Sequence, residues 1–441
     1  MQTSFAEVQL ADPATAVSAE VIRKCVHCGF CLATCPTYLL LGDELDSPRG
    51  RIYLMKDMLE NDREPTPELV KHVDRCLSCL SCMSTCPSGV NYMHLVDHAR
   101  AYIEQRYTRP LSERIVRALL AFVLPHPSRF RFALALARLA APIAPLLSKV
   151  PGCQPVSAML ELVPAGAAAA ASPSKASPCG GVARRGRVAL LQGCAEPVLR
   201  PEIRSAAVRL LNRAGYDVIF AAGEACCGAL VHHMGREKAA LEAARRNVDA
   251  WTGETERGGL DAIVITASGC GTTIKNYGFM LRADAEYATK AARVSALARD
   301  ISELLQDSAL PPGNGHGLTV AYHAACSLQH GQQITAPVKL LLAAGYVTRT
   351  PAEAHLCCGS AGTYNILQPQ IASRLADRKM ANIEQLKPDV VATSNIGCAM
   401  QLAKRTSLPV VHTVELLDWA TGGPMPPALS SPSLKATGSD A

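Results

Sequence analysis

The chain has 441 residues, of which 49% are hydrophobic and 19% are charged, so it is long enough for two or three folded domains and does not have the composition of a disordered protein. Its net charge of +6 is mild and is not gathered in basic runs with interleaved aromatic residues, which argues against a nucleic-acid partner. No run of about eighteen apolar residues occurs, so we expect no membrane-spanning helix.

The N-terminal segment, MQTSFAEVQLADPATA, has neither the positive start nor the apolar stretch of an export signal. This predicts a cytoplasmic location. In a reducing compartment the 18 cysteines are expected to be metal ligands or buried thiols rather than disulfides.

Eight of these cysteines form two runs with the same spacing, CVHCGFCLATCP from Cys25 to Pro36 and CLSCLSCMSTCP from Cys76 to Pro87. CxxCxxCxxxCP is the spacing of bacterial two-cluster ferredoxins, in which the fourth cysteine of each run binds the other cluster. Zinc is the alternative for four thiolates, but zinc sites usually use separated cysteine pairs. We therefore predict two 4Fe-4S clusters, with the ligands Cys25, Cys28, Cys31 and Cys86 for the first and Cys76, Cys79, Cys82 and Cys35 for the second.

The segments around these runs predict a small domain and a connector. A helix is expected over residues 49–60, between the two runs, within a mainly α-helical ferredoxin-like domain covering residues 1–105. Residues 106–164 are basic and apolar, with eight Lys or Arg up to Lys149 against the single acidic residue Glu113. They are read as short helices that pack over the cluster domain, or as a segment that docks on an anionic membrane surface or a partner's groove.

A run rich in Ala, Ser, Pro and Gly over residues 165–186 predicts a flexible linker. After it, strand and helix patterns alternate twice, which predicts two α/β units with parallel sheets over residues 187–310 and 311–420. Residues 421–441 are expected to be a disordered tail. The fold class is thus α+β overall, with a helical cluster domain followed by duplicated α/β units.

Each α/β unit carries four cysteines, two of them in a Cys-Cys-Gly (CCG) motif, and the two sets are offset by 132, 131, 131 and 128 residues. Their position just after predicted strands is the ligand-binding edge of an open α/β sheet. Four interpretations of these cysteines stay open: structural zinc, free thiols, a further iron-sulfur cluster and an active redox site. His323, at the expected end of a strand, is a candidate proton-transferring group or ligand. The eight cysteines concerned are Cys194, Cys226, Cys227, Cys270, Cys326, Cys357, Cys358 and Cys398.

Over residues 20–420 the chain resembles the iron-sulfur subunits of glycolate oxidase, on the two ferredoxin runs, the CCG motifs and the stretches CPTYLLLGDELDSPRGRIYLMK, LLQGCAEP, ITASGCG, CCGSAGTYN and TSNIGCAMQL. Similar architecture occurs in the iron-sulfur subunit of anaerobic glycerol-3-phosphate dehydrogenase, in an L-lactate utilisation iron-sulfur protein and in heterodisulfide reductase subunits. In heterodisulfide reductases each CCG unit ends in CxxC, which supplies a fifth cysteine to a non-cubane cluster. Here Ala267 and Asn395 stand at that position, which speaks against such a cluster and against disulfide chemistry.

The resemblance implies an electron-transfer subunit without catalytic residues of its own. Two FAD-linked oxidase-type partner subunits would carry the flavin and oxidise glycolate, and also D-lactate, to the 2-oxo acid. This chain would pass the electrons to a quinone-type or membrane acceptor from the cytoplasmic face of the inner membrane. A heterodisulfide-reductase-like catalyst, a glycerol-3-phosphate or lactate dehydrogenase subunit and a zinc-stabilised docking module are the alternatives.

Overall fold

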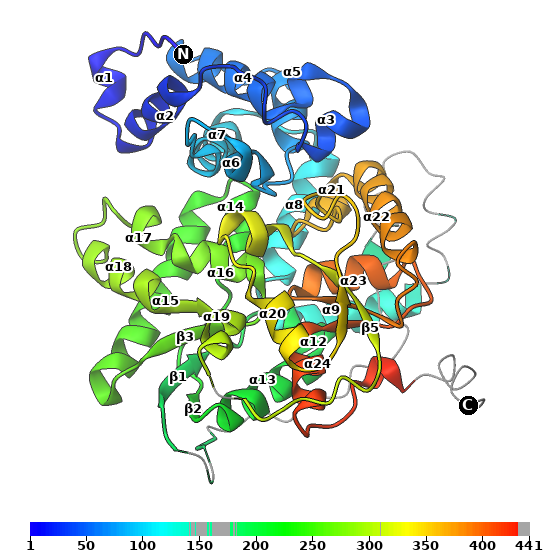
Figure 1. The fold of residues 1–441 in the computed structure, drawn as a ribbon. Helices are drawn as coiled ribbons and strands as arrows, with labels where there is room; N and C mark the ends of the chain where they lie inside the picture. The colour runs from blue at the N-terminus through cyan, green and yellow to red at the C-terminus, as the bar shows by residue number, and fades with distance from the viewer. Residues whose placement is uncertain are drawn as a thin grey trace.

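The structure is a computed structural model that describes residues 1–140, 142, 146, 157, 159–160, 177–179, 181, 183–308 and 310–430. Within this part of the chain, an N-terminal helical domain lies across two α/β units that pack side by side (Figure 1). The expected linker, residues 165–186, falls largely outside the described residues. No described helix is long and apolar enough to cross a bilayer.

Proline and polar caps fix where the helices of the N-terminal domain begin. Asp12, Ser47 and Thr66 each accept a hydrogen bond from a backbone N–H of the first turn, and each is followed directly by proline, which is suited to the first helical position. The expected helix over 49–60 is confirmed as α4. The helices are α1 (Glu7–Leu10), α2 (Pro13–Lys24), α3 (Pro36–Leu41), η1 (Glu44–Asp46), α4 (Pro48–Glu60), α5 (Pro67–Asp74), α6 (Ser81–Thr85) and α7 (Tyr92–Arg106).

Two short helices follow, α8 (Leu111–Val123) and α9 (Pro127–Ala140), as expected for a segment broken by prolines. Arg109 and Arg117 tie the start of this segment to the N-terminal domain, because both donate to the carboxylate of Asp74, at 2.5 and 2.9 Å. The buried faces of the two helices, which include Leu120 and Leu134, turn towards the α/β units.

The first α/β unit is a parallel sheet of four strands in the order β2-β1-β3-β4, with helices connecting the strands. The strand β3 is buried along its whole length, as expected for a parallel strand covered on both faces. Its elements are β1 (Gly186–Leu190), α12 (Glu196–Leu199), α13 (Pro201–Arg213), β2 (Tyr216–Ile219), α14 (Ala229–His233), α15 (Glu237–Gly258), β3 (Ala262–Ile265), α16 (Ser268–Lys275), α17 (Tyr277–Met280), α18 (Ala288–Leu297), β4 (Ala298–Asp300) and α19 (Ile301–Gln306).

The second unit repeats this plan, with a parallel sheet in the order β6-β5-β7-β8. The duplication of the cysteines is therefore matched by a duplication of sheet topology. Its elements are β5 (Thr319–His323), η3 (Ser327–Gly331), α20 (Ala336–Ala343), β6 (Val347–Arg349), α21 (Tyr364–Leu367), α22 (Pro369–Glu384), β7 (Val390–Thr393), α23 (Ile396–Ala403), β8 (Val410–His412), α24 (Thr413–Ala420) and η4 (Pro427–Leu429).

The two units share one hydrophobic core, to which strands of both sheets contribute. The helices α13 and α24 pack together across the boundary, and Arg209 and Arg213 of α13 form ion pairs with the buried Asp418 of α24. Residues 421–430, which we expected to be the start of a disordered tail, continue this packing, because Leu429 of η4 is buried in the shared core. The remainder of that tail, residues 431–441, lies outside the described residues.

Candidate iron-sulfur and thiol sites

The first three cysteines of the first ferredoxin run and the last cysteine of the second run line one cavity, which Cys82 of the second predicted set also lines. Cys86 lies close enough to Cys25 to raise the pKa of its thiol, after the larger effect of burial. Burial also raises the pKa of the Cys31 thiol to about 11. A thiol of this kind must lose its proton to bind a metal, so metal binding here releases protons. Cys25, Cys28, Cys31 and Cys86 therefore fit one 4Fe-4S cluster.

The second predicted ligand set is also brought together. The pKa of Cys82 is raised well above its usual value by burial and then by the neighbouring Cys79, Cys76 and Cys35. Cys35 belongs to the first run, so the proximity has the crossed pattern that the ferredoxin spacing predicts. The Sγ atom of Cys76 receives hydrogen bonds from the Ser78 amide, at 3.5 Å, and the Tyr92 hydroxyl, at 3.8 Å. Donors of this kind stabilise negative charge on cluster sulfur ligands.

The two runs follow the same backbone path. The second and fourth residues after the first cysteine of each run have positive φ angles, 56° and 85° at His27 and Gly29, and 49° and 61° at Ser78 and Leu80. Only one of the four is a glycine, so the loops hold three side chains in a conformation that costs roughly 1–2 kcal/mol each. Such strain at matched positions is typical of a loop whose shape is set by what it binds.

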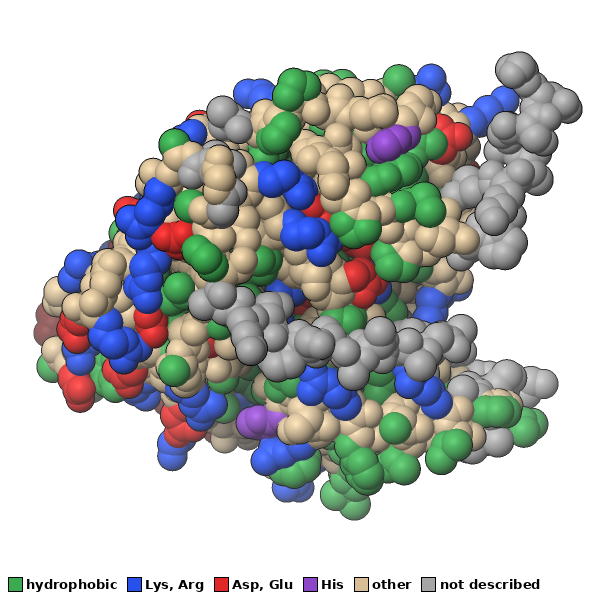
Figure 2. Space-filling view, turned by 90° about the horizontal axis from the view of Figure 1, so that it is seen from below, with side chains coloured by type: hydrophobic (Ala, Val, Ile, Leu, Met, Phe, Trp, Pro, Cys, Tyr) green, Lys and Arg blue, Asp and Glu red, His purple; other side chains and the backbone are tan. Residues whose placement is uncertain are grey.

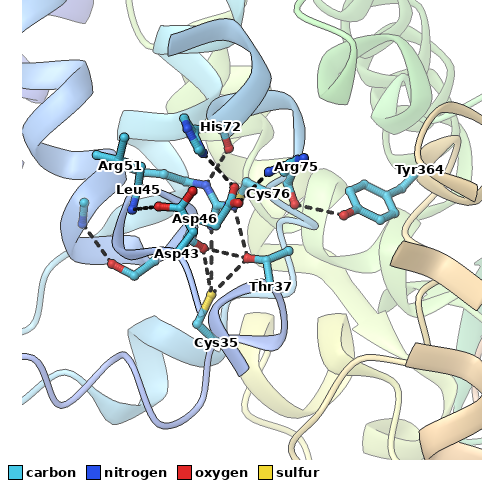
Figure 3. Close-up of polar contacts among 12 residues, drawn as sticks. Cys35, Thr37, Asp43, Leu45, Asp46, Arg51, His72, Arg75, Cys76 and Tyr364 are labelled. Carbon is cyan, nitrogen blue, oxygen red and sulfur yellow. Dashed lines mark hydrogen bonds and ion pairs between the residues drawn. The ribbon is translucent and has the colours of Figure 1, made fainter. Parts of the chain in front are cut away.

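A buried charge network supports the second ligand set (Figure 3). Asp46 and Arg51 are almost completely buried, and the Nη2 atom of Arg51 lies 3.3 Å from Oδ1 of Asp46. The same carboxylate accepts from His72 Nδ1 at 2.9 Å and from Arg75 at 2.7 Å. The Nη1 atom of Arg51 points to the Sγ atom of Cys35 at 3.9 Å, so a positive charge lies beside a predicted cluster ligand. No local motif signals this network in the sequence, because Asp46 and His72 are 26 residues apart.

The cysteines of both CCG units meet at a single cavity of about 450 Å³, which is lined by residues that follow strands of both sheets. In the first unit the Sγ atoms of Cys194 and Cys226 lie 3.5 Å apart, and in the second unit those of Cys326 and Cys357 lie 3.7 Å apart. Apolar side chains of α8 and α9 also line the cavity. The basic connector therefore lies against the thiol-bearing units. The cavity is lined by all eight predicted cysteines, Cys194, Cys226, Cys227, Cys270, Cys326, Cys357, Cys358 and Cys398.

Ionisable side chains around this cavity have strongly shifted pKa values. Burial raises the pKa of Glu196, which accepts from the Thr266 hydroxyl at 2.7 Å, to about 7. Burial likewise lowers the pKa of His233 to about 4 and that of His323 to about 3. Burial thus favours the neutral imidazole of His323, and its role as a proton-transferring group or ligand stays a prediction. Sequence reasoning did not single out Glu196, because a glutamate after a cysteine has no distinctive pattern.

The helical domain docks on the second CCG unit next to these thiols. Leu77 and Cys79 share a hydrophobic cluster with Cys357, and Cys326 packs against that cluster. The hydroxyl of Tyr364 donates to the Arg75 carbonyl at 2.9 Å across the same boundary. The second ferredoxin ligand set is therefore adjacent to the thiols of the second unit.

A two-cluster ferredoxin-type domain joined to two thiol-bearing α/β units defines an iron-sulfur protein of the CCG-domain class. Two family models match the chain, "4Fe-4S dicluster domain" over residues 21–90 and "Cysteine-rich domain" over residues 188–275 and 320–403.

Relatives along the whole chain narrow this class. The chain is 44% identical to the "Glycolate oxidase iron-sulfur subunit" of Escherichia coli over 95% of this chain and 99% of that protein. It is 32% identical to a Bacillus subtilis protein named "Probable glycolate oxidase iron-sulfur subunit", over 91% of this chain and 94% of that protein. The chain belongs to the family of glycolate oxidase iron-sulfur subunits.

A hypothetical protein from Helicobacter pylori has a similar fold. Its crystal structure matches 95% of this chain and 74% of that chain with a TM-score of 0.51. The two sequences are 11% identical, so the likeness concerns the fold alone.

Proposed function

We propose that this chain is the electron-relay subunit of a glycolate-oxidising complex. Two FAD-bearing partner subunits oxidise glycolate, and also D-lactate, and this chain passes the electrons towards a quinone-type acceptor. The observation that carries the proposal is the gathering of eight ferredoxin-type cysteines in one small domain whose Cys79 packs beside Cys357 of the second CCG unit. When bound, 4Fe-4S clusters accept and release single electrons.

The residues around the predicted ligands perform three tasks in this proposal. The cysteines hold the clusters, and the buried apolar neighbours Leu77 and Leu80 keep water away from the second ligand set. The hydrogen bonds from Tyr92 and the Ser78 amide to the Cys76 sulfur, together with the charge of Arg51 beside Cys35, stabilise the electron-rich state.

We further propose that α8 and α9 hold the subunit on the cytoplasmic face of the inner membrane. Large hydrophobic side chains recur on their outer faces at helical spacing, and the basic residues Arg114, Arg129 and Arg131 are exposed among them. The molecular surface also shows hydrophobic side chains gathered among Lys and Arg side chains (Figure 2). The outward-facing hydrophobic residues are Leu111, Ile115, Leu119, Phe122, Phe132, Leu136 and Leu139.

Iron and sulfide analysis tests the two-cluster assignment. The isolated chain is expected to hold about eight iron and eight sulfide ions in the ferredoxin-type domain, and Cys28→Ser and Cys79→Ser are each expected to remove about half. Cys179→Ser is the matched control, because Cys179 is a free thiol outside both ligand sets. Unchanged iron in both ligand variants would overturn the assignment.

Reconstitution with the flavin partners tests the relay. Reduction of the clusters by glycolate, followed by EPR, is expected only when the partners are present. Reduction by glycolate of the isolated chain would contradict the proposal. Reduction of a disulfide or a quinone by this chain without a flavin partner would instead favour a catalytic role for the CCG thiols.

Vesicle flotation tests the membrane contact. The double variant Ile115→Glu/Phe122→Glu is expected to lose binding to vesicles that contain anionic lipid, while cluster content stays normal, because both side chains are exposed. Equal binding of the variant and the wild-type chain would exclude this surface.

A further inference from the structure

The second CCG unit contains a buried imidazole whose ring nitrogens have no hydrogen-bond partner. His323 is the last residue of β5 and is 1% exposed, and neither Nδ1 nor Nε2 finds a partner among the described residues. Leaving a polar group unsatisfied in the interior costs about 1–3 kcal/mol. A buried nitrogen of this kind points to something the ring binds.

Two cysteines lie within reach of the same ring. A ring nitrogen of His323 and the Sγ atoms of Cys358 and Cys398 all lie within 4.8 Å of one another. Ligand atoms around one tetrahedral zinc ion are separated by roughly 3.5–3.8 Å, given bonds of about 2.3 Å to sulfur and about 2.0 Å to nitrogen. In a cubane cluster each cysteine holds a different iron, which separates the sulfurs by roughly 6 Å. The trio therefore matches a single ion better than a cluster.

The charges of the trio also suit a divalent ion. Two thiolates balance the charge of one divalent cation, and a neutral imidazole adds none, so a loaded site introduces no net charge into the interior. The buried Lys379 ammonium lies near these thiols and donates to the Glu353 carbonyl at 2.6 Å.

The first unit lacks this arrangement. The residue equivalent to His323, three positions before the first cysteine of the unit, is Leu191, which packs in the core of the first unit. The sheets and the cysteines are duplicated, but the imidazole is not. The two units are therefore chemically different at the same structural position.

Both cysteines of the trio line the large cavity that the two units share. Zinc sites that bind an exchangeable ligand have three protein ligands and leave the fourth position open, whereas structural zinc sites have four protein ligands. We propose that the second CCG unit binds one tetrahedral, thiol-preferring divalent ion such as Zn²⁺ through His323, Cys358 and Cys398, with the fourth position open to the cavity. This site is separate from the two ferredoxin-type ligand sets.

Titration of the anaerobic full-length chain with Co²⁺ tests the site, because cobalt reports its thiolate ligands through charge-transfer absorption. The wild-type chain is expected to bind one Co²⁺ with the intensity of two thiolates, in competition with Zn²⁺. Cys398→Ser is expected to weaken binding more than about tenfold. His323→Leu, which introduces the residue of the first unit, should do the same. Cys270→Ser, the corresponding change in the first unit, is expected to leave binding unchanged.

A further variant separates loss of the ligand from loss of the fold. His323→Cys is expected to restore binding with the charge-transfer intensity of three thiolates. Cobalt binding that is equal in His323→Leu and the wild-type chain would overturn the proposal. The proposal would also fail if the second unit yielded additional inorganic sulfide together with its metal. EPR of the ferredoxin-type clusters is expected to be the same in all these variants, which separates this site from the proposed relay.

Discussion

Replacing Arg51 by methionine is predicted to be the most damaging single change in the helical domain outside the cysteines. Breaking one partner of a buried ion pair costs about 3–5 kcal/mol. The lower end applies here, because Arg75 still faces the other oxygen of Asp46. The Arg51 guanidinium also donates to the His72 carbonyl at 2.6 Å and to Thr37 Oγ1 at 3.1 Å, and losing a donor to a buried acceptor adds about 1–3 kcal/mol.

We therefore expect Arg51→Met to destabilise the domain by about 4–6 kcal/mol. With an m-value of about 2 kcal/mol/M, this lowers the urea midpoint by about 2–3 M. The assay is urea unfolding under anaerobic conditions, followed by the loss of cluster absorbance. Asp46→Asn in the Arg51→Met chain removes a buried carboxylate charge that Arg75 compensates only in part, and it is expected to recover at least about 1 kcal/mol.

Arg49→Met is the matched control, because the Arg49 side chain is 32% exposed and pairs with the 44% exposed Glu44. A surface pair of this kind contributes less than about 1 kcal/mol. Equal urea midpoints for Arg51→Met and Arg49→Met would refute the reasoning about burial.

Three further predictions test other parts of the fold. Gly235→Ala is expected to lower the free energy of unfolding by about 1–3 kcal/mol more than Gly259→Ala, as measured by urea unfolding. Both glycines have positive φ, but a Cβ at Gly235 would lie 2.3 Å from the Arg100 carbonyl of the helical domain, whereas Gly259 has open space. Equal costs would contradict this domain contact. Burial raises the pKa of Asp300 from 3.8 to about 6, so the folded state holds its proton more tightly and wild-type stability falls as the pH rises from 3.8 to about 6. Asp300→Asn removes this pH dependence, so the variant's free energy of unfolding should rise by roughly 1.4 kcal/mol relative to that of the wild-type chain between about pH 5 and about pH 7.5. A difference in urea midpoint between the two chains that is the same at both pH values would contradict this prediction. Trp251→Ala, at a fully buried position, is expected to cost about 3–5 kcal/mol by thermal unfolding, and a change below about 1 kcal/mol would exclude tight packing of α15.

The sequence was informative wherever the signal is local. The spacing of the ferredoxin-type cysteines lies within twelve residues per run, and the alternation of strands and helices after residue 186 is repeated twice, so both could be predicted. The strands β4 and β8 were not predicted, because three residues each are too short to show a period.

Features that depend on tertiary packing could not be predicted. Nothing near Asp46 indicates that its carboxylate is buried against Arg51, because both residues are of types that usually lie on the surface. The shared cavity was likewise out of reach, since the repeat predicts four cysteines per unit but not that the two sets face each other. His323 could be singled out only by its place at a strand end.

The contact between Cys79 and Cys357 joins two domains of one polypeptide. A separate ferredoxin would have to find its acceptor by diffusion, and that encounter would depend on concentration and on salt. A tethered donor meets its acceptor at an effective concentration set by the chain itself, in the millimolar range even for a loose linker. The distance between the second ferredoxin-type ligand set and the thiols of the second unit is therefore independent of dilution, and in the proposed relay only the encounters with the flavin partners and with the final acceptor depend on concentration.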